Sequence, residues 1–157
     1  MISQKAKYAF KALFHLAELP PGLSASIEVI ASAETIPRKF LEHILLQLKR
    51  GRIVASQRGP YGGYRLVVTP AEVTIGRILR LVDGPMAPLP CLSRTAYRRC
   101  PDCSDEHTCA VRHLFAEAYA VQLAQFDSTT LGDALRARPA SLAPDSVRDG
   151  VPESLHS

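Results

Sequence analysis

Tryptophan is absent from this 157-residue chain, and aromatic residues make up only 6% of it. Leu, Ile, Val and Ala must therefore fill any hydrophobic core, and the 46% of hydrophobic residues is enough to exclude general disorder. No apolar run approaches the roughly 20 residues of a membrane span. The first ten residues, MISQKAKYAF, lack the apolar stretch of a secretory signal. These absences predict a cytoplasmic protein of one domain plus an extension, with no membrane partner.

Cysteine is absent everywhere except in one stretch, CLSRTAYRRCPDCSDEHTC, which runs from Cys91 to Cys109. Structural disulfides are disfavoured in the cytoplasm, so clustered cysteines there indicate metal ligands or a redox switch. The gaps of eight, two and five residues match neither a standard zinc finger nor the common ferredoxin patterns. Zinc, an iron–sulfur cluster and a thiol/disulfide switch all stay open. Nearby arginines are expected to lower the thiol pKa values: Arg94, Arg98, Arg99 and Arg112.

The formal charge of +4 is distributed unevenly along the chain. Residues 1–65 carry ten Lys and Arg against four acids, whereas from Asp127 onward five acids face three arginines. A basic front half predicts a polyanionic partner, although a solvated basic surface would have the same composition. No arrangement of nucleophile and base stands out around the cysteines, so the sequence favours a protein that is not an enzyme.

Helical spacing of apolar residues predicts helices over 4–19, 27–34, 37–50 and 75–83. Pro37 is expected in the first turn of the third helix, Phe40 in its buried stripe, and Gly51 as the C′ residue that ends it. Two strands, 53–56 and 64–68, flank the glycine-rich turn QRGPYGG. The sequence therefore predicts a winged helix-turn-helix domain over 1–84, with the helix-turn-helix at about 27–50 and the wing at about 53–68.

Beyond this domain we expect a cysteine-rich sensor loop over 85–109, then a long helix and a short terminal helix over 110–135. Residues 136–157 lack periodicity, which predicts a disordered tail. The expected fold class is mainly α with a small β-hairpin wing and a long C-terminal dimerisation helix. That helix needs a partner surface, the same helix of a second subunit, because it carries two apolar edges. One edge holds Tyr119 and Leu123, and the other holds Val111, Leu114, Phe115, Ala118, Val121 and Phe126.

A helix-turn-helix presents the start of its second helix to the major groove of DNA. The candidate contacts there are Arg38, Lys39, Glu42 and His43. A carboxylate can accept a hydrogen bond from cytosine N4, so Glu42 is a candidate specificity residue, unless it only pairs with Arg38 or Lys39. Arg58 at the wing tip, with Gly59 and Tyr61 beside it, suits the minor groove.

Several stretches together resemble the Rrf2 family of bacterial winged-helix regulators, which includes the IscR, NsrR and RirA groups. They are SQKAKYA at 3–9, IPRKFLEHIL at 36–45, the wing RGPYGGYRL at 58–66, the cysteine loop, CAVR at 109–112, and Thr130-Leu131. The resemblance covers about residues 1–135 and implies a homodimer that binds a palindromic operator. It implies base reading by Glu42, minor-groove contact by Arg58, and an iron–sulfur cluster on Cys91, Cys103 and Cys109.

The loop departs from the family pattern at the fourth ligand. IscR-like members have a histidine where this chain has Arg112, and NsrR-like members have an acidic residue where it has Lys7. The candidates are the extra Cys100, whose thiolate suits iron, then His113 and His107. The cluster type, [2Fe-2S] or [4Fe-4S], stays open. The expected function is a repressor controlled by iron, redox or nitric oxide status. The alternatives are zinc or a thiol/disulfide switch in the loop, or a winged helix that contacts proteins.

Overall fold

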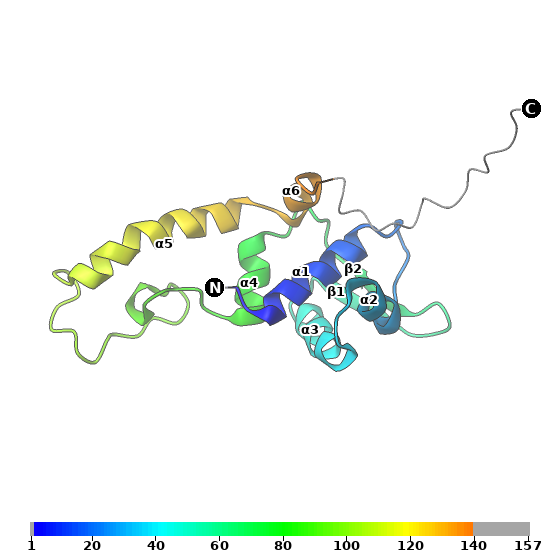
Figure 1. Ribbon diagram of the computed structural model, residues 1–157, viewed down its shortest axis with the longest axis horizontal. Coiled ribbons are helices and arrows are strands. Elements are labelled where there is room, and N and C mark those ends of the chain that lie inside the picture. Colours follow the sequence, from blue (N-terminus) through cyan, green and yellow to red (C-terminus); the bar gives the residue numbers. More distant parts are fainter. Residues whose placement is uncertain (1, 140–157) are drawn as a thin grey trace, which may run out of the picture.

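Helices α1 (Gln4–Ala17), α3 (Arg38–Arg50) and α4 (Ile75–Asp83) pack against one another and enclose the hydrophobic core. The computed structural model, which describes residues 2–139, also has α2 (Ile27–Glu34) packed on α1 and α3. Together with a two-stranded wing these helices form a winged helix-turn-helix, and a long helix extends away from it (Figure 1). The predicted fold class is confirmed.

Side-chain caps set where the helices begin. Ser3, Ser26 and Thr74 each accept a hydrogen bond from the third backbone N–H of the following helix. Thr35 adopts a left-handed conformation (φ 54°), which makes the tight turn between α2 and α3 possible. Two expected bounds were wrong: α1 ends at Ala17 rather than at residue 19, and Pro37 precedes α3 instead of lying in its first turn.

Two expectations about α3 were also wrong. Gly51 has φ −76°, and the left-handed residue is Arg52 (φ 55°). A Cβ on Gly51 would lie 2.2 Å from a Leu81 methyl carbon, so the glycine permits close packing rather than a left-handed turn. Phe40 is 42% exposed, because its ring lies edge-on against Tyr8 at the rim of the core, with 5.7 Å between the ring centroids.

The wing consists of β1 (Val54–Gln57) and β2 (Gly63–Leu66), each shifted by one or two residues from the predicted strands. They pair antiparallel, from Val54 opposite Leu66 to Gln57 opposite Gly63. Ala25 and Tyr64 exchange backbone hydrogen bonds of 2.9 and 2.7 Å. The wing is therefore attached to the segment that leads into α2, and this attachment sets its position relative to α2 and α3.

Helix α5 (Ala110–Ser128) carries its apolar residues on two faces. Tyr119 and Leu123 are buried against the rest of the chain, and half-buried Phe126 joins them instead of the outer stripe to which the sequence assigned it. The outer face is exposed and holds Val111, Leu114, Phe115, Ala118 and Val121. None of the helices within residues 2–139 is long and apolar enough to cross a membrane.

The end of α5 returns to the winged-helix core through α6 (Leu131–Arg136). Backbone hydrogen bonds join Ile75 to Thr129 and Leu131 to Val73, each at 2.9 Å, and the Leu131 side chain is fully buried in the core. The sequence did not predict this contribution to the domain expected over 1–84. Of the predicted tail, residues 140–157 lie outside the described part of the chain.

Candidate nucleic-acid interface and cysteine site

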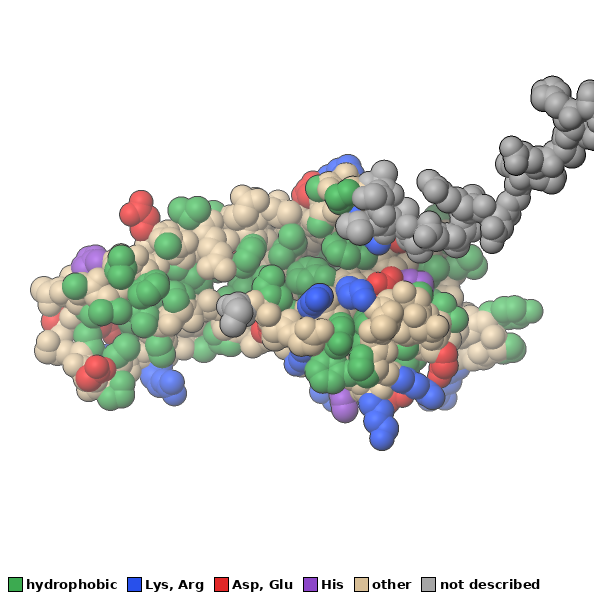
Figure 2. Space-filling view, in the orientation of Figure 1, with side chains coloured by type: hydrophobic (Ala, Val, Ile, Leu, Met, Phe, Trp, Pro, Cys, Tyr) green, Lys and Arg blue, Asp and Glu red, His purple; other side chains and the backbone are tan. Residues whose placement is uncertain are grey.

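The outer face of α3 presents the four residues expected to contact base edges. Arg38, Lys39, Glu42 and His43 are all exposed, because Leu41, Ile44, Leu45 and Leu48 turn the opposite face into the core. Figure 2 shows Lys and Arg side chains gathered along the lower edge of the winged-helix half, where Figure 1 places α3. The fold thus leaves a surface with exposed basic side chains available for a polyanion.

Arg38 forms ion pairs with two carboxylates on this surface. Its guanidinium lies 2.9 Å from Glu28 of α2 and 3.3 Å from Oε1 of Glu42, one helical turn along α3. A backbone hydrogen bond at the start of α2, and then the charge of Arg38, lower the pKa of Glu28. The pairing of Glu42 with Arg38, one of the two readings of Glu42, is present. The other oxygen of Glu42 has no partner among the described residues, so it stays available as an acceptor.

The wing tip exposes Arg58, Gly59 and Tyr61, the last with 90% of its surface accessible. The tip is a tight turn in which the Gly62 N–H donates to the Gly59 carbonyl at 2.9 Å. Ser24 donates a hydrogen bond to the Tyr61 carbonyl oxygen at 3.0 Å, a second link between the wing and the segment before α2. The wing that carries Arg58 is thus joined by hydrogen bonds to the chain just before α2, the first helix of the helix-turn-helix.

Gly63→Ala is expected to lower the free energy of unfolding by more than Gly59→Ala does. Both glycines have positive φ (148° and 112°), so both substitutions strain the backbone by roughly 1–3 kcal/mol. Only at Gly63 would a Cβ also collide with backbone, 2.3 Å from the Ala25 carbonyl oxygen; at Gly59 it meets open space. Urea denaturation of the two variants measures the difference. Equal losses would contradict the close approach of the wing to Ala25.

The four thiols of the cysteine-rich loop, residues 85–109, lie in two adjacent pairs. Cys91 is buried in the 3-10 turn η1 (Pro90–Leu92), and the other three are half-buried. The Cys100 thiol lies next to that of Cys91, and the Cys103 thiol next to that of Cys109. Cys109 caps α5, where its sulfur accepts from the Arg112 N–H at 3.5 Å. The long gap after Cys91 thus folds back and returns Cys100 to it.

Backbone hydrogen bonds hold this folded-back loop. The Arg98 N–H donates to the Pro90 carbonyl at 3.2 Å, which places the chain before Cys100 next to η1. The Cys103 N–H donates to the Cys100 carbonyl at 3.2 Å and forms the CPDC turn. Arg99 donates to the carbonyl oxygens of Cys103 and Ser104, at 3.1 and 2.7 Å. Arg99 therefore stabilises the turn more than it stabilises thiolates.

The expected lowering of the thiol pKa values was wrong for two cysteines. Desolvation, together with the adjoining Cys91 thiol, raises the pKa of Cys100. Desolvation and the adjacent Cys109 raise the pKa of Cys103, and the opposing charge of Arg99 does not overcome them. Both thiols are consequently protonated at neutral pH. Binding of a metal must displace these protons, so it tightens as pH rises.

Among the histidine candidates for the fourth ligand, His113 differs from Cys100 because its ring is already hydrogen-bonded. The His113 Nε2 donates a hydrogen bond to the His107 carbonyl at 2.6 Å, so one of its ring nitrogens is already in use. Within residues 2–139, no three His, Cys, Asp or Glu side chains converge closely enough to hold one metal ion. By donor chemistry, four soft thiols in one loop suit an iron–sulfur cluster or zinc. A shared centre requires the two pairs to move together.

Comparison with known proteins identifies a family and several related regulators. Residues 2–137 match the Rrf2 family, described as an iron-dependent transcriptional regulator. The chain is 50% identical over 142 residues to an rrf2-like HTH-type transcriptional regulator of Rhodobacter capsulatus, covering 87% of this chain and 93% of that protein. It is 31% identical over 132 residues to the HTH-type transcriptional regulator CymR of Bacillus subtilis, covering 84% and 87%.

Solved structures show the same fold. CymR of B. subtilis, described as the global cysteine regulator, superimposes with a TM-score of 0.72 at 28% identity, covering 88% of this chain and 98% of that one. IscR of T. potens superimposes with a TM-score of 0.70 at 22% identity, covering 91% of each chain. The relatives are transcriptional regulators rather than enzymes. This chain belongs to the Rrf2 family of DNA-binding transcriptional regulators.

Proposed function

We propose that this chain is a homodimeric repressor whose binding to a palindromic operator is set by an iron–sulfur cluster on Cys91, Cys100, Cys103 and Cys109. The observation that carries the proposal is the gathering of all four thiols into two adjacent pairs in one loop, with Cys109 capping the start of α5. The description of the family as iron-dependent supports iron over other metals. The cluster would be held by thiolates alone, with His113 and His107 as the less favoured fourth ligands.

In the proposed complex, α3 enters the major groove and the wing lies along the adjacent minor groove. Arg38 holds one oxygen of Glu42 at 3.3 Å and leaves the other to accept from cytosine N4. Arg58 at the exposed wing tip inserts into the minor groove, whose negative potential attracts arginine. A two-fold dimer places two such surfaces on successive turns of DNA, which requires a palindromic site.

Glu42→Ala and Arg58→Ala are expected to affect DNA binding in different ways. Loss of Glu42 should relax the preference for its base pair by about 1–3 kcal/mol, with a smaller change in affinity for unrelated DNA. Loss of Arg58 should weaken binding and reduce the salt dependence, because a cation leaves the interface. Fluorescence anisotropy on the operator and on single-base variants measures both. The control is Arg98→Ala, which removes the same charge in the sensor loop; an equal loss there would contradict the assigned surface.

The position of the loop allows a rearrangement of its cysteines to affect the DNA-binding half. Cys109 is the capping residue of α5, and η1, which carries Cys91, contacts α5 directly. α5 in turn packs on α4, and α4 on the recognition helix α3. When bound, an iron–sulfur cluster supplies a soft centre that iron limitation, oxidants or nitric oxide can alter. Rearrangement of the cysteines would then shift the start of α5 and with it the spacing of the two recognition helices.

Anaerobic purification, followed by visible absorbance and by iron and sulfide assays, tests the cluster. The wild-type protein is expected to be brown with matched iron and sulfide, and each variant, Cys91→Ala, Cys100→Ala, Cys103→Ala and Cys109→Ala, is expected to lose colour and iron. If Cys100→Ala alone retains the cluster, the fourth ligand lies elsewhere, and His113→Ala and His107→Ala identify it. A colourless wild-type protein with stoichiometric zinc, or with no metal, contradicts the proposal.

The contacts between Cys91 and Cys100 and between Cys103 and Cys109 also favour a second candidate, a thiol/disulfide switch. In this case the metal-free protein, treated with a mild oxidant, should form these two disulfides and no others, as peptide mapping after alkylation would show. Operator affinity would then differ between the oxidised and reduced metal-free forms.

A further inference from the structure

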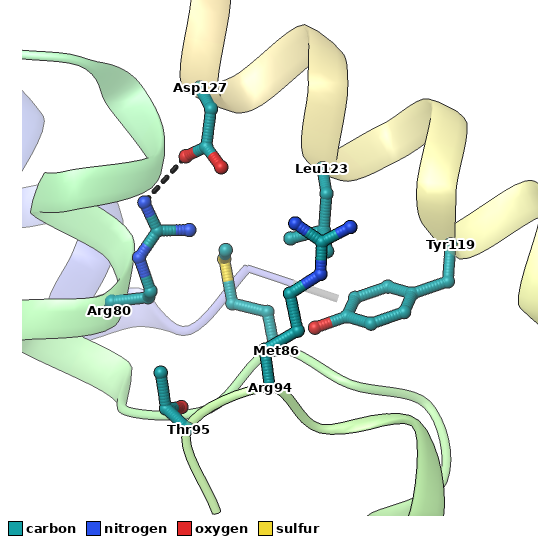
Figure 3. Close-up of a pocket in the computed structure, with 7 residues that line it drawn as sticks. All are labelled: Arg80, Met86, Arg94, Thr95, Tyr119, Leu123 and Asp127. Atoms are coloured by element: carbon teal, nitrogen blue, oxygen red, sulfur yellow. Dashed lines mark hydrogen bonds and ion pairs between the residues drawn. The ribbon is translucent and has the colours of Figure 1, made fainter.

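A cavity of about 150 Å³ lies where α4, the segment after η1 and α5 meet (Figure 3). Met86 and Leu123 form its apolar wall. Arg80 of α4 and Asp127 of α5 close one side with an ion pair of 2.5 Å. Arg94, Thr95 and Tyr119 supply the remaining polar groups. Neither the DNA-binding surface nor the thiol pairs use this cavity.

Two of these polar groups lack partners. Tyr119 is only 8% exposed, yet its hydroxyl, which points into the cavity, has no hydrogen-bond partner within residues 2–139. Arg94 is exposed, so the cavity opens to solvent on this side, and its guanidinium lies beside the Tyr119 ring. It forms no ion pair with any residue within 2–139. Arg80 is neutralised by Asp127, so the cavity keeps one unbalanced positive charge. The Tyr119 hydroxyl and the Arg94 guanidinium are therefore both available as donors to an anion that enters the cavity.

We propose that this cavity binds a small aliphatic carboxylate. A planar carboxylate can accept two parallel hydrogen bonds from the Arg94 guanidinium and one from the Tyr119 hydroxyl. Its short carbon chain would lie against Met86 and Leu123. The volume is well below the roughly 300–1,000 Å³ of sites for larger ligands, so the acid has only a few carbon atoms. Thr95 lies at the edge as a further donor.

Occupation of the cavity would link three elements. The bound acid would join Arg94, three residues after Cys91, to Tyr119 of α5 and to the α4 side chains around the ion pair. It would therefore restrain the sensor loop against both the winged helix and the dimerisation helix. Binding of the acid requires neither a cluster nor DNA. An effect of the acid on operator affinity rests on the proposed function.

Ligand-observed NMR titration of the full chain, without DNA, tests the site with linear and branched carboxylates of three to six carbons. Isovalerate serves as the reference probe, and isovaleramide is its uncharged isostere. We expect a carboxylate of this set to bind with a dissociation constant of about 1 mM or tighter, and the matching amide not to bind. Arg94→Gln should weaken binding about tenfold or more, and Tyr119→Phe severalfold while preserving packing. Arg98→Gln, which removes a charge from the same loop outside the cavity, should bind as the wild type does.

Three results would overturn the proposal. They are absence of binding by every acid of the set, equal binding of the amide, and wild-type affinity in both Arg94→Gln and Tyr119→Phe. Equal affinity for inorganic phosphate would show a general anion site instead of a carboxylate site. Because the titration contains no DNA, its result is separate from the operator and cluster assays. If the acid binds but operator affinity does not change, the cavity is a carboxylate site, and the proposed coupling between this site and DNA binding is wrong.

Discussion

Leu114→Asp is expected to separate the proposed homodimer into monomers and to weaken operator binding by at least about 30-fold. Leu114 is 71% exposed and lies in the middle of the outer stripe of α5, among Val111, Ala118 and Val121. A large apolar side chain at the centre of an interface contributes about 2 kcal/mol or more, roughly 30-fold in affinity, and a buried unpaired carboxylate costs more. Sedimentation velocity and operator titration measure the two effects.

The matched control is Ala120→Asp, which adds the same charge to α5 at an exposed position off both apolar faces. It should remain dimeric and bind the operator nearly as the wild type does. If Leu114→Asp stays dimeric at the same concentrations, α5 is not the dimer interface, and a different partner must cover its outer apolar face. A monomer that keeps full operator affinity would instead contradict binding as a two-fold pair.

Leu131→Ala is expected to lower the free energy of unfolding by about 2–5 kcal/mol, the range for truncating a fully buried leucine. Leu131 lies in the core of the winged-helix half although it follows α5 in the chain. Its position is fixed by a capping box, in which the Thr130 hydroxyl accepts from the Asp133 N–H at 3.0 Å and the Asp133 carboxylate accepts from Thr130. The hydrogen bond from the Thr130 side chain, followed by that from its backbone, lowers the pKa of Asp133.

Guanidinium denaturation measures this loss, with Leu23→Ala as the control. Leu23 is an exposed leucine in a loop of the same domain, and its truncation should change stability by no more than about 0.5 kcal/mol. Because Leu131 also fastens the end of α5, the Leu131→Ala variant should weaken operator binding even under conditions in which it remains folded. An equal effect of the two substitutions would show that α6 docks only superficially.

Most of the fold could be predicted from the order of residues alone. Apolar spacing, caps and the glycine-rich turn are local signals, and they placed the helices and both strands within a few residues. The cysteine stretch, the recognition-helix residues and the wing tip were identified the same way, and the family resemblance that rests on them is confirmed. These features depend on residues that are close together in the chain, so patterns in the sequence can predict them.

Only the tertiary structure decided which distant residues meet. The sequence did not show that Leu131 completes the core, that Arg38 also pairs with Glu28, or that Gly51 lies against Leu81. It placed arginines near the thiols but could not weigh their charge against desolvation, so the direction of the Cys100 pKa shift was missed. The sequence by itself determined a winged-helix regulator with a four-cysteine loop. Packing decided the pairing of those cysteines, the two faces of α5 and the cavity beside Tyr119, because each depends on contacts between elements far apart in the chain.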